Sequence, residues 1–377
     1  MFTISRFLDS SRFVPIWLLI VLLIAILAPD SGCAAKEARN PDRTTLLALG
    51  NWDSSTDYRR PPHGGKAVLL LNSRGELVRQ IPRSTANRGS SGCRGISVSQ
   101  DGRSFVVCDY STEGISMYRT ANGIKFWSLA GFFQSAVFAD GIIYALGTES
   151  VYAIDRTGTV VMHSRIGWAI DIVFDSKSKC LWIVGGDIKK YNMDLQLLFE
   201  VRLPFSTAYG AAFSVDLNPD GSVWVAGRNI FGREGDENQL VKISPAGQLL
   251  KVIDLDFCPL RVRVNRSDGS VWTTGKVRRQ GYSRIDERLE GDEWPETTAE
   301  LDALIITKVQ THTRKYDSEG KLLVKGTQGG TSIEVNPSDG SVWIAGDKSI
   351  LHYSSTGTNL ATYTGTSGSQ KWLAVIP

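Results

Sequence analysis

The sequence predicts an all-β fold, a seven-bladed β-propeller of four-stranded antiparallel blades, and three observations carry that prediction. One consensus hairpin recurs along the chain, most clearly at 215–227, 262–275 and 333–346. A second hairpin follows each copy, and two hairpins supply the four strands of a blade. The first unit lacks an innermost strand, whereas 371–377 matches an innermost strand and has no others. We therefore expect the C-terminal strand to pair with the N-terminal blade and to close the ring.

The residues at each turn indicate where the predicted hairpins lie. The first hairpin of a unit turns on Asp-Gly or Ser-Asp-Gly, which supplies the positive φ that a tight turn needs, and Val-Trp opens its return strand. Weaker copies span 96–108, 136–147 and 172–185. The second hairpin turns on a glycine in six units and on Met193-Asp194-Leu195 in the fourth. The six glycines are Gly75, Gly123, Gly158, Gly247, Gly320 and Gly357.

Residues 1–35 are interpreted as a signal peptide or an N-terminal membrane or lipid anchor. Arg6 and Arg12 precede an apolar run over 14–28, which is shorter than the roughly 20 residues that a membrane span needs. Cleavage is the first interpretation and an uncleaved anchor the alternative. Residues 30–33 resemble a bacterial lipoprotein cleavage box, which implies lipidation at Cys33, although Asp30 stands where that box has an aliphatic residue.

The domain organisation follows from this leader. Residues 36–43 are expected to be a linker and 44–377 the propeller, placed outside the cytoplasm as a periplasmic, cell-surface or secreted protein. Membrane association is expected through the N-terminal segment alone. The 42 basic and 39 acidic residues are spread along the chain without a Lys/Arg block, so nucleic acid is not expected as a partner.

The five cysteines contain no CxxC pair, and the Asp-Gly pairs are explained by turn chemistry, so neither a metal site nor a cofactor is predicted. A hairpin that turns at residues 101–102 places Gly95 opposite Cys108. Cys93 is then close to the distance at which a disulfide with Cys108 can form. A Cys93–Cys108 disulfide is one interpretation, and two partly buried thiols are the other. Cys180 and Cys258 are interpreted as small core side chains.

Charged residues fall in register on the predicted innermost strands. Asp216, Arg263 and Glu334 share one position on three consecutive blades, and Asp171 and Arg261 lie two residues earlier, nearer the mouth of the axis. Buried charges are costly unless they are paired or hydrated. We therefore weigh two interpretations: ion pairs between blades in a wet channel, or an axial ligand site in which the two arginines hold an anionic group.

Three long connections are expected to open on the face where the innermost strands begin. They span 53–66, 228–239 and about 276–306, and loops of this length inside a compact domain are usually functional or disordered. The last has helical spacing over 296–305 and is either a lid packed on the rim or a partner-binding element. The rim residues predicted to bind a partner are Tyr58, Arg60, Tyr282 and Trp294.

The hairpins 215–227 and 240–253 resemble the NHL and YVTN class of bacterial propellers, a group that includes streptogramin-lyase-like proteins. This resemblance implies blade geometry over nearly the whole folded chain and does not imply one function. A lyase of that type would have a histidine at the channel mouth. His63 lies in the first long connection, and none of the other three histidines, His163, His312 and His352, maps to an innermost strand.

We therefore expect an extracytoplasmic, non-catalytic module that binds a protein, peptide or glycan on the insert-bearing face, with no catalytic residue assigned. The alternative is a lyase or hydrolase of streptogramin-lyase-like or lactonase-like type that uses the axial site. Its side chains would be scattered over several blades, where no sequence motif reveals them.

Overall fold

The computed structural model describes residues 46–52, 67–82, 93–205, 210–229, 238–278, 309–326, 328–346, 349–364 and 370–376. These belong to one compact unit, Thr45–Pro377. The predicted leader, linker and Cys33 lie outside the described residues. Among those described, no helix has the length and apolar character to cross a membrane.

The described residues form seven antiparallel sheets, numbered here in chain order, of which six have four strands. Sheet 1 joins both ends of the chain and runs β27 (Gln370–Ile376), β1 (Leu46–Trp52), β2 (Ala67–Leu71), β3 (Leu77–Pro82). Sheet 2 has three strands: β4 (Cys93–Val98), β5 (Ser104–Arg119), β6 (Lys125–Phe132). Sheet 3 runs β7 (Ser135–Ala139), β8 (Ile142–Leu146), β9 (Ser150–Ile154), β10 (Val160–Arg165).

The remaining four sheets are each built from consecutive strands. Sheet 4 runs β11 (Ala169–Asp175), β12 (Cys180–Gly185), β13 (Ile188–Asn192), β14 (Leu197–Val201). Sheet 5 runs β15 (Gly210–Leu217), β16 (Val223–Asn229), β17 (Gln239–Ile243), β18 (Leu249–Asp254). Sheet 6 runs β19 (Cys258–Val264), β20 (Val271–Arg278), β21 (Val309–Tyr316), β22 (Leu322–Gly326). Sheet 7 runs β23 (Ser332–Val335), β24 (Val342–Ala345), β25 (Ser349–Tyr353), β26 (Asn359–Thr364).

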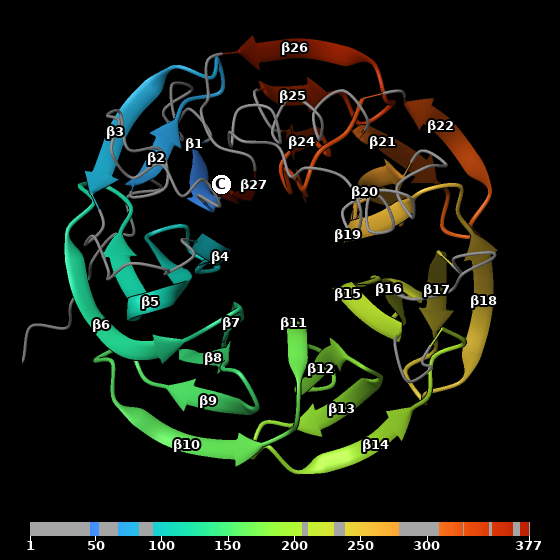
Figure 1. Cartoon of the computed structure of the whole chain (residues 1–377). Coiled ribbons are helices and arrows are strands. Elements are labelled where there is room, and N and C mark those ends of the chain that lie inside the picture. The colour runs from blue at the N-terminus through green and yellow to red at the C-terminus, as the bar shows by residue number, and fades with distance from the viewer. Residues whose placement is uncertain are drawn as a thin grey trace, which may run out of the picture. The chain divides into compact units, whose positions relative to one another are not determined.

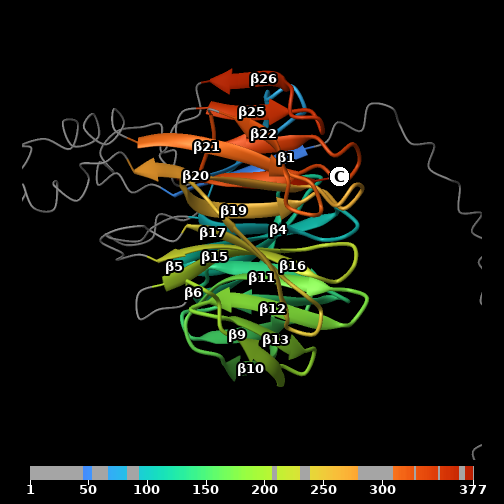
Figure 2. The same cartoon turned by 90° about the vertical axis from the view of Figure 1, so that its right-hand side faces the viewer.

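Figure 1 shows these sheets arranged around a common axis, with the first strand of each sheet innermost. Each innermost strand contacts the next in the order β27, β4, β7, β11, β15, β19, β23, and β23 contacts β27. Figure 2 shows the strands from the side, where β20 and β21 lie next to each other as their pairing requires. The predicted all-β propeller of four-stranded antiparallel blades is confirmed.

The predicted count of seven four-stranded blades is wrong, because six sheets have four strands and sheet 2 has three. The difference lies in β5, which has 16 residues. A straight strand of that length would span roughly 50 Å. However, the amide of Thr120 donates to the carbonyl of Arg103 at 2.9 Å, so the two ends of β5 are adjacent, and Gly114 takes a positive φ of 60° between them. One bent element thus occupies the second and third strand positions.

The predicted pairing of the chain ends is present. β27 pairs with β1 over seven residues, from Leu46 opposite Ile376 to Trp52 opposite Gln370. The boundary of the long connection in sheet 6 differs from the expectation, because β20 continues to Arg278 and β21 begins at Val309. The connection is therefore 279–308 rather than about 276–306.

Every sheet donates a side-chain hydrogen bond to a backbone carbonyl in the turn before the outermost strand of the next sheet, and we call these contacts the inter-sheet latches. The donors and acceptors are Arg79 to Asn122 (2.5 Å), Trp127 to Arg156 (3.0 Å), Tyr144 to Met193 (2.8 Å), Lys190 to Pro245 (3.0 Å), Lys242 to Ser318 (3.0 Å), Lys315 to Ser355 (2.5 Å) and Tyr363 to Ser73 (3.0 Å). The last latch joins sheet 7 to sheet 1 and so links segments from the two ends of the chain.

The same turns explain why glycine recurs in the second hairpins. All six predicted glycines have a positive φ, and in sheet 4 that conformation falls on Leu195, one of the three residues at which the turn was predicted. The turns also press against the preceding sheet: a Cβ added to Gly75 would lie 2.2 Å from the ring of Tyr363, and one added to Gly158 would lie 2.7 Å from Trp127. Glycine is therefore required both for the turn and for the contact between sheets.

The hydrophobic core lies between adjacent sheets rather than within one. One cluster joins Trp182 and Val184 of sheet 4 to Val215 and Val225 of sheet 5, and the other clusters likewise join two neighbours. The tryptophan of each Val-Trp strand start is fully buried. Burying such large rings supplies much of the apolar stabilisation that a stack of separate sheets needs.

Candidate functional site

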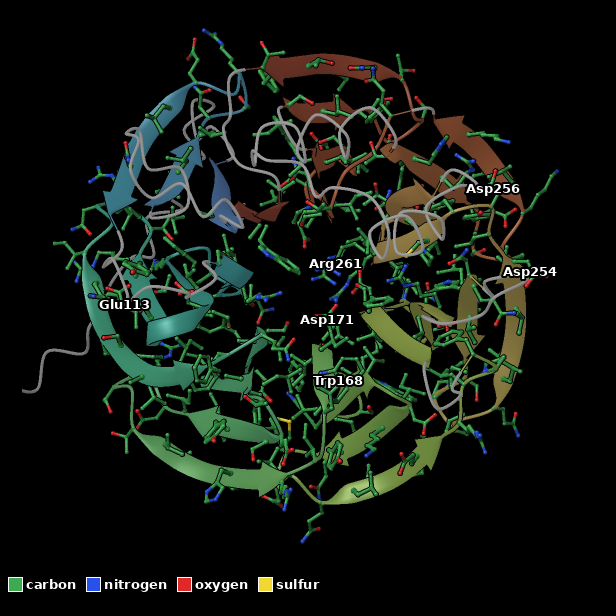
Figure 3. The ribbon with its side chains drawn as sticks, in the orientation of Figure 1. Glu113, Trp168, Asp171, Asp254, Asp256 and Arg261 are labelled. Atoms are coloured by element: carbon green, nitrogen blue, oxygen red, sulfur yellow. The ribbon has the colours of Figure 1, made fainter. Side chains whose placement is uncertain are left out.

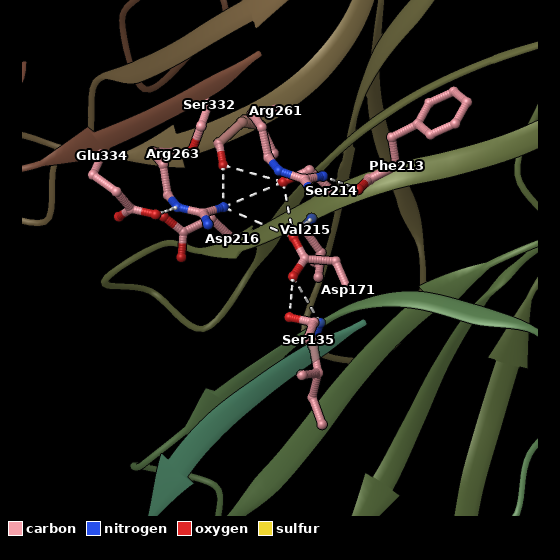
Figure 4. A network of polar contacts seen from close by, with 12 residues as sticks. Ser135, Asp171, Phe213, Ser214, Val215, Asp216, Arg261, Arg263, Ser332 and Glu334 are labelled. Atoms are coloured by element: carbon pink, nitrogen blue, oxygen red, sulfur yellow. Dashed lines mark hydrogen bonds and ion pairs between the residues drawn. The ribbon is translucent and has the colours of Figure 1, made fainter. Parts of the chain in front are cut away.

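The five charged residues predicted at the axis lie in the described part of the chain, and the innermost strands bring them together. Arg261 and Asp171 point into the axial region in Figure 3, and Figure 4 shows them in one group with Asp216, Arg263 and Glu334. These side chains come from sheets 4, 5, 6 and 7, so the site exists only when neighbouring sheets pack.

Arg263 is the centre of the network. Its Nε donates to Oε1 of Glu334 at 2.7 Å, and its Nη1 donates to the hydroxyl of Ser214 at 3.2 Å and to the carbonyl of Val262 at 2.8 Å. The Asp171 carboxylate lies 3.8 Å from Nη1. Burial disfavours the charged form, but Glu334 and the nearby aspartates outweigh it and raise the pKa of Arg263 above its ordinary value. This arginine is paired, as the first of our two interpretations expects.

Asp171 is held by donors from three sheets. Its Oδ1 accepts from the hydroxyl of Ser135 at 2.9 Å and from its neighbour's amide, and its Oδ2 accepts from the hydroxyl of Ser214 at 2.9 Å and the amide of Val215 at 3.3 Å. A carboxylate with this many donors is fixed in position. Asp171 therefore works as a joint between sheets 3, 4 and 5.

Asp216 also joins two sheets, at the register position two residues further along the innermost strand than Asp171. Its carboxylate accepts the amide of Leu217 at 2.8 Å and, across the sheet boundary, the amide of Val264 at 2.8 Å. Nη2 of the exposed Arg266 lies 3.9 Å from it. Asp216 is thus used mainly to join sheet 5 to sheet 6.

Glu334 is the titratable group of this network. Its side chain is 19% exposed, and burial raises its pKa to about 7. Arg263 opposes that rise by attracting the ionised form, whereas the negative charges of Asp216 and Asp171 add to it. A carboxyl group that gains and loses a proton near neutral pH therefore sits at the axis.

Arg261 differs from Arg263 because, among the described residues, no carboxylate lies within 4.0 Å of its guanidinium. The residue is 6% exposed. Nη1 donates to the carbonyls of Phe213 at 2.6 Å and Leu260 at 3.0 Å, and the guanidinium carbon lies 3.8 Å from the centre of the Trp372 ring. Burial lowers the pKa of Arg261 to about 10, so the group is charged at neutral pH but is held there at a desolvation cost.

A repeated backbone irregularity aims these side chains at the axis. The pairing between the first and second strands of sheets 2, 4, 5 and 6 shifts register by one residue, immediately before Gly95, Asp171, Ser214 and Arg261. Such a bulge bends a strand and re-aims the next side chain. It also takes a carbonyl out of the ladder, and the carbonyls of the bulged residues Phe213 and Leu260 are the two that fix Arg261.

Sequence reasoning missed the residues that support the charges. Trp372 was predicted to lie on the closing strand, but its contact with the Arg261 guanidinium was not predicted. Ser135 and Ser214 were recognisable only because they share a register position with Asp171. Trp168, which immediately precedes β11, was also missed; it is 49% exposed and lies beside the axial region in Figure 3. An exposed tryptophan next to fixed charges is a common feature of ligand sites.

The other predicted site residues are distributed differently. Tyr58, Arg60, Tyr282, Trp294 and His63 lie outside the described residues. His163 lies on the outermost strand β10 and His352 on β25, as predicted, whereas His312 lies within β21 rather than just before it. Burial lowers the pKa of both His312 and His352. In the described part of the chain, no innermost strand carries a histidine, and no group of three or more His, Cys, Asp or Glu side chains is arranged to hold a metal ion.

Cys93 is the first residue of β4, and Cys108 lies within β5. Gly95 lies opposite Cys108, which confirms the predicted register, while Cys93 pairs with Asp109. Both cysteines are buried, and their disulfide stays a prediction. Cys180 and Cys258 are also buried, as expected of small core side chains.

Comparisons with known proteins support the fold. No family model matches the sequence, and comparison with curated proteins gives no match. Among solved structures, the chain is similar to hydrazine synthase of Kuenenia stuttgartiensis, with a TM-score of 0.59 and 10% identity over 75% of this chain and 91% of that one. It is also similar to a chain of the mitotic checkpoint complex, with a TM-score of 0.54 and 12% identity over 80% and 82%. At such low identity, both show a shared β-propeller fold alone.

Proposed function

We propose that this chain is an extracytoplasmic binding module that recognises a protein, peptide or glycan, and that Arg261 holds an anionic group of that partner at the axial mouth. The observation that carries the proposal is the contrast between two neighbouring arginines. Arg263 has carboxylates at 2.7 and 3.8 Å, whereas Arg261 is buried with no carboxylate within 4.0 Å in the described part of the chain. A buried charge without a counter-charge is unfavourable, and a ligand anion would remove that cost.

The guanidinium is prepared for such a ligand. Within the described residues, Arg261 makes its hydrogen bonds through Nη1, while Trp372 supports one face of the planar group. Its other nitrogens retain the geometry for a two-point bond to a carboxylate or phosphate. Because backbone carbonyls and a ring fix the side chain before binding, little side-chain entropy is lost when an anion arrives.

Further parts of the proposal rest on the sequence. The export leader or lipid anchor supports an extracytoplasmic location, and the repeated hairpins support an NHL- or YVTN-type propeller. The rim residues Tyr58, Arg60, Tyr282 and Trp294 are proposed to contact the partner around the axial anion site.

The test uses pairs of ligands that differ in one charge. The full chain would be screened against oligosaccharides as uronic acids and as their methyl esters, and against peptides with a free or an amidated C-terminus. We expect binding of the anionic members and its loss in Arg261→Gln. Arg266→Gln is the matched control, since Arg266 is exposed on the turn that follows β19. Equal binding of charged and neutral members, or binding that survives Arg261→Gln, would refute the proposal.

The second candidate is a lyase or hydrolase that uses the axial site. One observation favours it: the pKa of Glu334, raised to about 7, suits a group that transfers protons near neutral pH. The screen would use sugar lactones and cyclic ester-containing peptides. An enzyme of this type would lose turnover in Glu334→Gln while it kept ligand affinity, and the combined Arg263→Ala and Glu334→Ala change would abolish both. An absence of turnover in the intact chain with every substrate that binds would refute this candidate.

A further inference from the structure

A cavity of about 250 Å³ lies between sheets 2 and 3, away from the axial charges. It is lined by Met117 of β5, Phe126 of β6 and Phe138 of β7, together with Asp101 from the β4–β5 turn and Arg156 from the β9–β10 turn. Ligand pockets for drug-sized molecules usually exceed roughly 300 Å³. This cavity suits a single side chain or a small molecule.

The equivalent place in sheets 4, 5 and 6 is filled by a lysine of the same chain. Lys190, Lys242 and Lys315 lie on the third strands, opposite a buried tryptophan on the second strand in each case. Each ammonium group lies 4.7 to 5.7 Å from the centre of that indole ring. Each also donates to a carbonyl in the next sheet's turn and so forms that sheet's inter-sheet latch.

A carboxylate from the first turn of the same sheet faces the lysine. Lys315 Nζ lies 3.9 Å from Asp268. Burial would raise the pKa values of Asp175, the last residue of β11, and of Asp220, but hydrogen bonds from Ser178 and Ser222 lower them. The positive charges of Lys190 and Lys242 lower them further. The position therefore has four parts: an aromatic wall, a turn aspartate, a turn carbonyl from the next sheet and a lysine ammonium.

Sheet 2 keeps three of these parts and lacks the lysine. Met117 precedes Tyr118 just as Lys190 precedes Tyr191, so a thioether stands where the other sheets have an ammonium group. Val106, which pairs with Ser97 of the innermost strand, stands where they have tryptophan. Valine in place of tryptophan leaves this position without the large ring of the other sheets, and Phe126 and Phe138 supply the aromatic wall instead.

The remaining polar groups are still arranged for a cation. The hydroxyl of Ser99 donates to Asp101 at 2.6 Å, as does the amide of Arg103 at 3.1 Å, and these bonds lower the pKa of Asp101, so its carboxylate is ionised at neutral pH. The latch carbonyl of Arg156 accepts from Trp127 at 3.0 Å. Three positive charges oppose a cation here: Arg103 and Arg156 act on Asp101, and the Arg119 guanidinium carbon lies 5.2 Å from the centre of the Phe126 ring. Among the described residues, Arg156 forms no ion pair within 4.0 Å.

We propose that this cavity binds an alkylammonium group, and that its occupant is the side chain of a lysine presented by a partner protein. The inserted lysine would repeat, between two chains, the contact that Lys190, Lys242 and Lys315 make within this one. Its methylene chain would pack against Met117 and Phe126, and its ammonium group would lie near Asp101 and the aromatic rings.

The experiment uses the methyl group of Met117 as the reporter, since the chain has four methionines and the signal can be assigned with Met117→Leu. The full chain, labelled at the methionine methyl groups, would be titrated with N-acetyl-lysine methylamide and with N-acetyl-norleucine methylamide. We expect a saturable shift of the Met117 signal with the lysine compound. The norleucine compound has the same chain length without the charge and should bind about fivefold more weakly or not at all.

Two exposed substitutions test the charges without disturbing the core. Asp101→Asn should weaken lysine binding about threefold to fivefold, and Arg156→Gln should strengthen it by a similar factor. Asp220→Asn is the matched control, because Asp220 occupies the same turn position beside the filled site of sheet 5. Arg261→Gln should leave the Met117 response unchanged, which separates this site from the proposed axial function.

Three outcomes would overturn the proposal. They are no shift of the Met117 signal with the lysine compound, an equal shift with norleucine, and an unchanged affinity in Asp101→Asn. A much tighter response to n-butylamine than to the lysine compound would exclude a partner's lysine as the occupant, because the acetyl and amide groups would then clash at the rim.

Discussion

Substituting Gly75 by alanine tests the contact that joins sheet 7 to sheet 1. Gly75 lies in the β2–β3 turn with a φ of 74°, and a Cβ there would lie 2.2 Å from the ring of Tyr363 on β26. Gly141, in the β7–β8 turn, provides the comparison: its φ is 88°, and a Cβ there would meet no atom within 4 Å. The two substitutions share the backbone cost and differ in the collision.

The expected magnitudes follow from these two contributions. Alanine in the left-handed region costs about 1–2 kcal/mol, which is the full effect expected at Gly141. At Gly75 the forced displacement of the Tyr363 ring adds about 1–3 kcal/mol, typical of an overpacked contact. That ring also forms the inter-sheet latch to Ser73 at 3.0 Å, so moving it weakens a hydrogen bond as well. Gly75→Ala should therefore cost about 2–5 kcal/mol in total.

Urea unfolding, followed by tryptophan fluorescence, measures both variants. With a slope of about 3 kcal/mol per molar urea, the difference between them corresponds to a midpoint roughly 0.3–1 M lower for Gly75→Ala. Combining Gly75→Ala with Tyr363→Ala should recover most of that difference, since the smaller side chain leaves room for the new methyl group. Equal midpoints for the two glycine variants, or a double variant whose costs simply add, would refute the contact between the two ends of the chain.

Three further predictions concern the axial network and the latches. Replacing Arg263 with glutamine leaves buried acids without their partner, so chemical denaturation should show a free energy of unfolding about 3–5 kcal/mol lower. The exposed control Arg266→Gln should lower it by about 0.5 kcal/mol or less. A similar small decrease for both variants would contradict the ion pairing. Burial raises the pKa of Glu334 to about 7 from an ordinary 4.5, so folding takes up a proton at pH values between the two. The free energy of unfolding should therefore fall by at most about 3 kcal/mol as the pH rises from 4.5 to about 7. Stability curves of Glu334→Gln should lack that decline, and a decline that persists would assign it to another group. Trp127→Phe removes the latch to the carbonyl of Arg156 and should cost about 1 kcal/mol in thermal unfolding, a result that an unchanged melting temperature would exclude.

The hairpins could be predicted from the sequence because their signals are local. An Asp-Gly or Gly turn between two short apolar runs sets both the turn conformation and the alternation of the strands, so strand ends and the positive φ at Gly247 followed directly. Sheet 2 was the exception: residues 111–114 contain Gly114, which has a positive φ of 60°, but they form a bend inside one element instead of a turn between two strands. The long element β5 that results depends on packing that no local pattern encodes.

The sequence predicted which residues of the axial site lie at the same depth on neighbouring innermost strands. Aligning the strands brought Asp216, Arg263 and Glu334 together, because a repeat fold places equivalent residues at equal depth. The alignment did not distinguish the paired Arg263 from the unpaired Arg261, since that difference depends on the bulges and on Trp372, which is remote in sequence. The cavity between sheets 2 and 3 was missed because it depends on Val106, which stands where sheets 4, 5 and 6 have a tryptophan.

Sheet 1 has a consequence for how the chain is made. Its strands β1, β2 and β3 are synthesised before every other described strand, but their innermost partner β27 is the last described strand to be synthesised. Until that strand arrives, β1 presents an open row of backbone donors and acceptors that other chains can pair with. The other six sheets must therefore be synthesised before sheet 1 is complete, and a ribosome that stalls shortly before Gln370 would release a product prone to self-association.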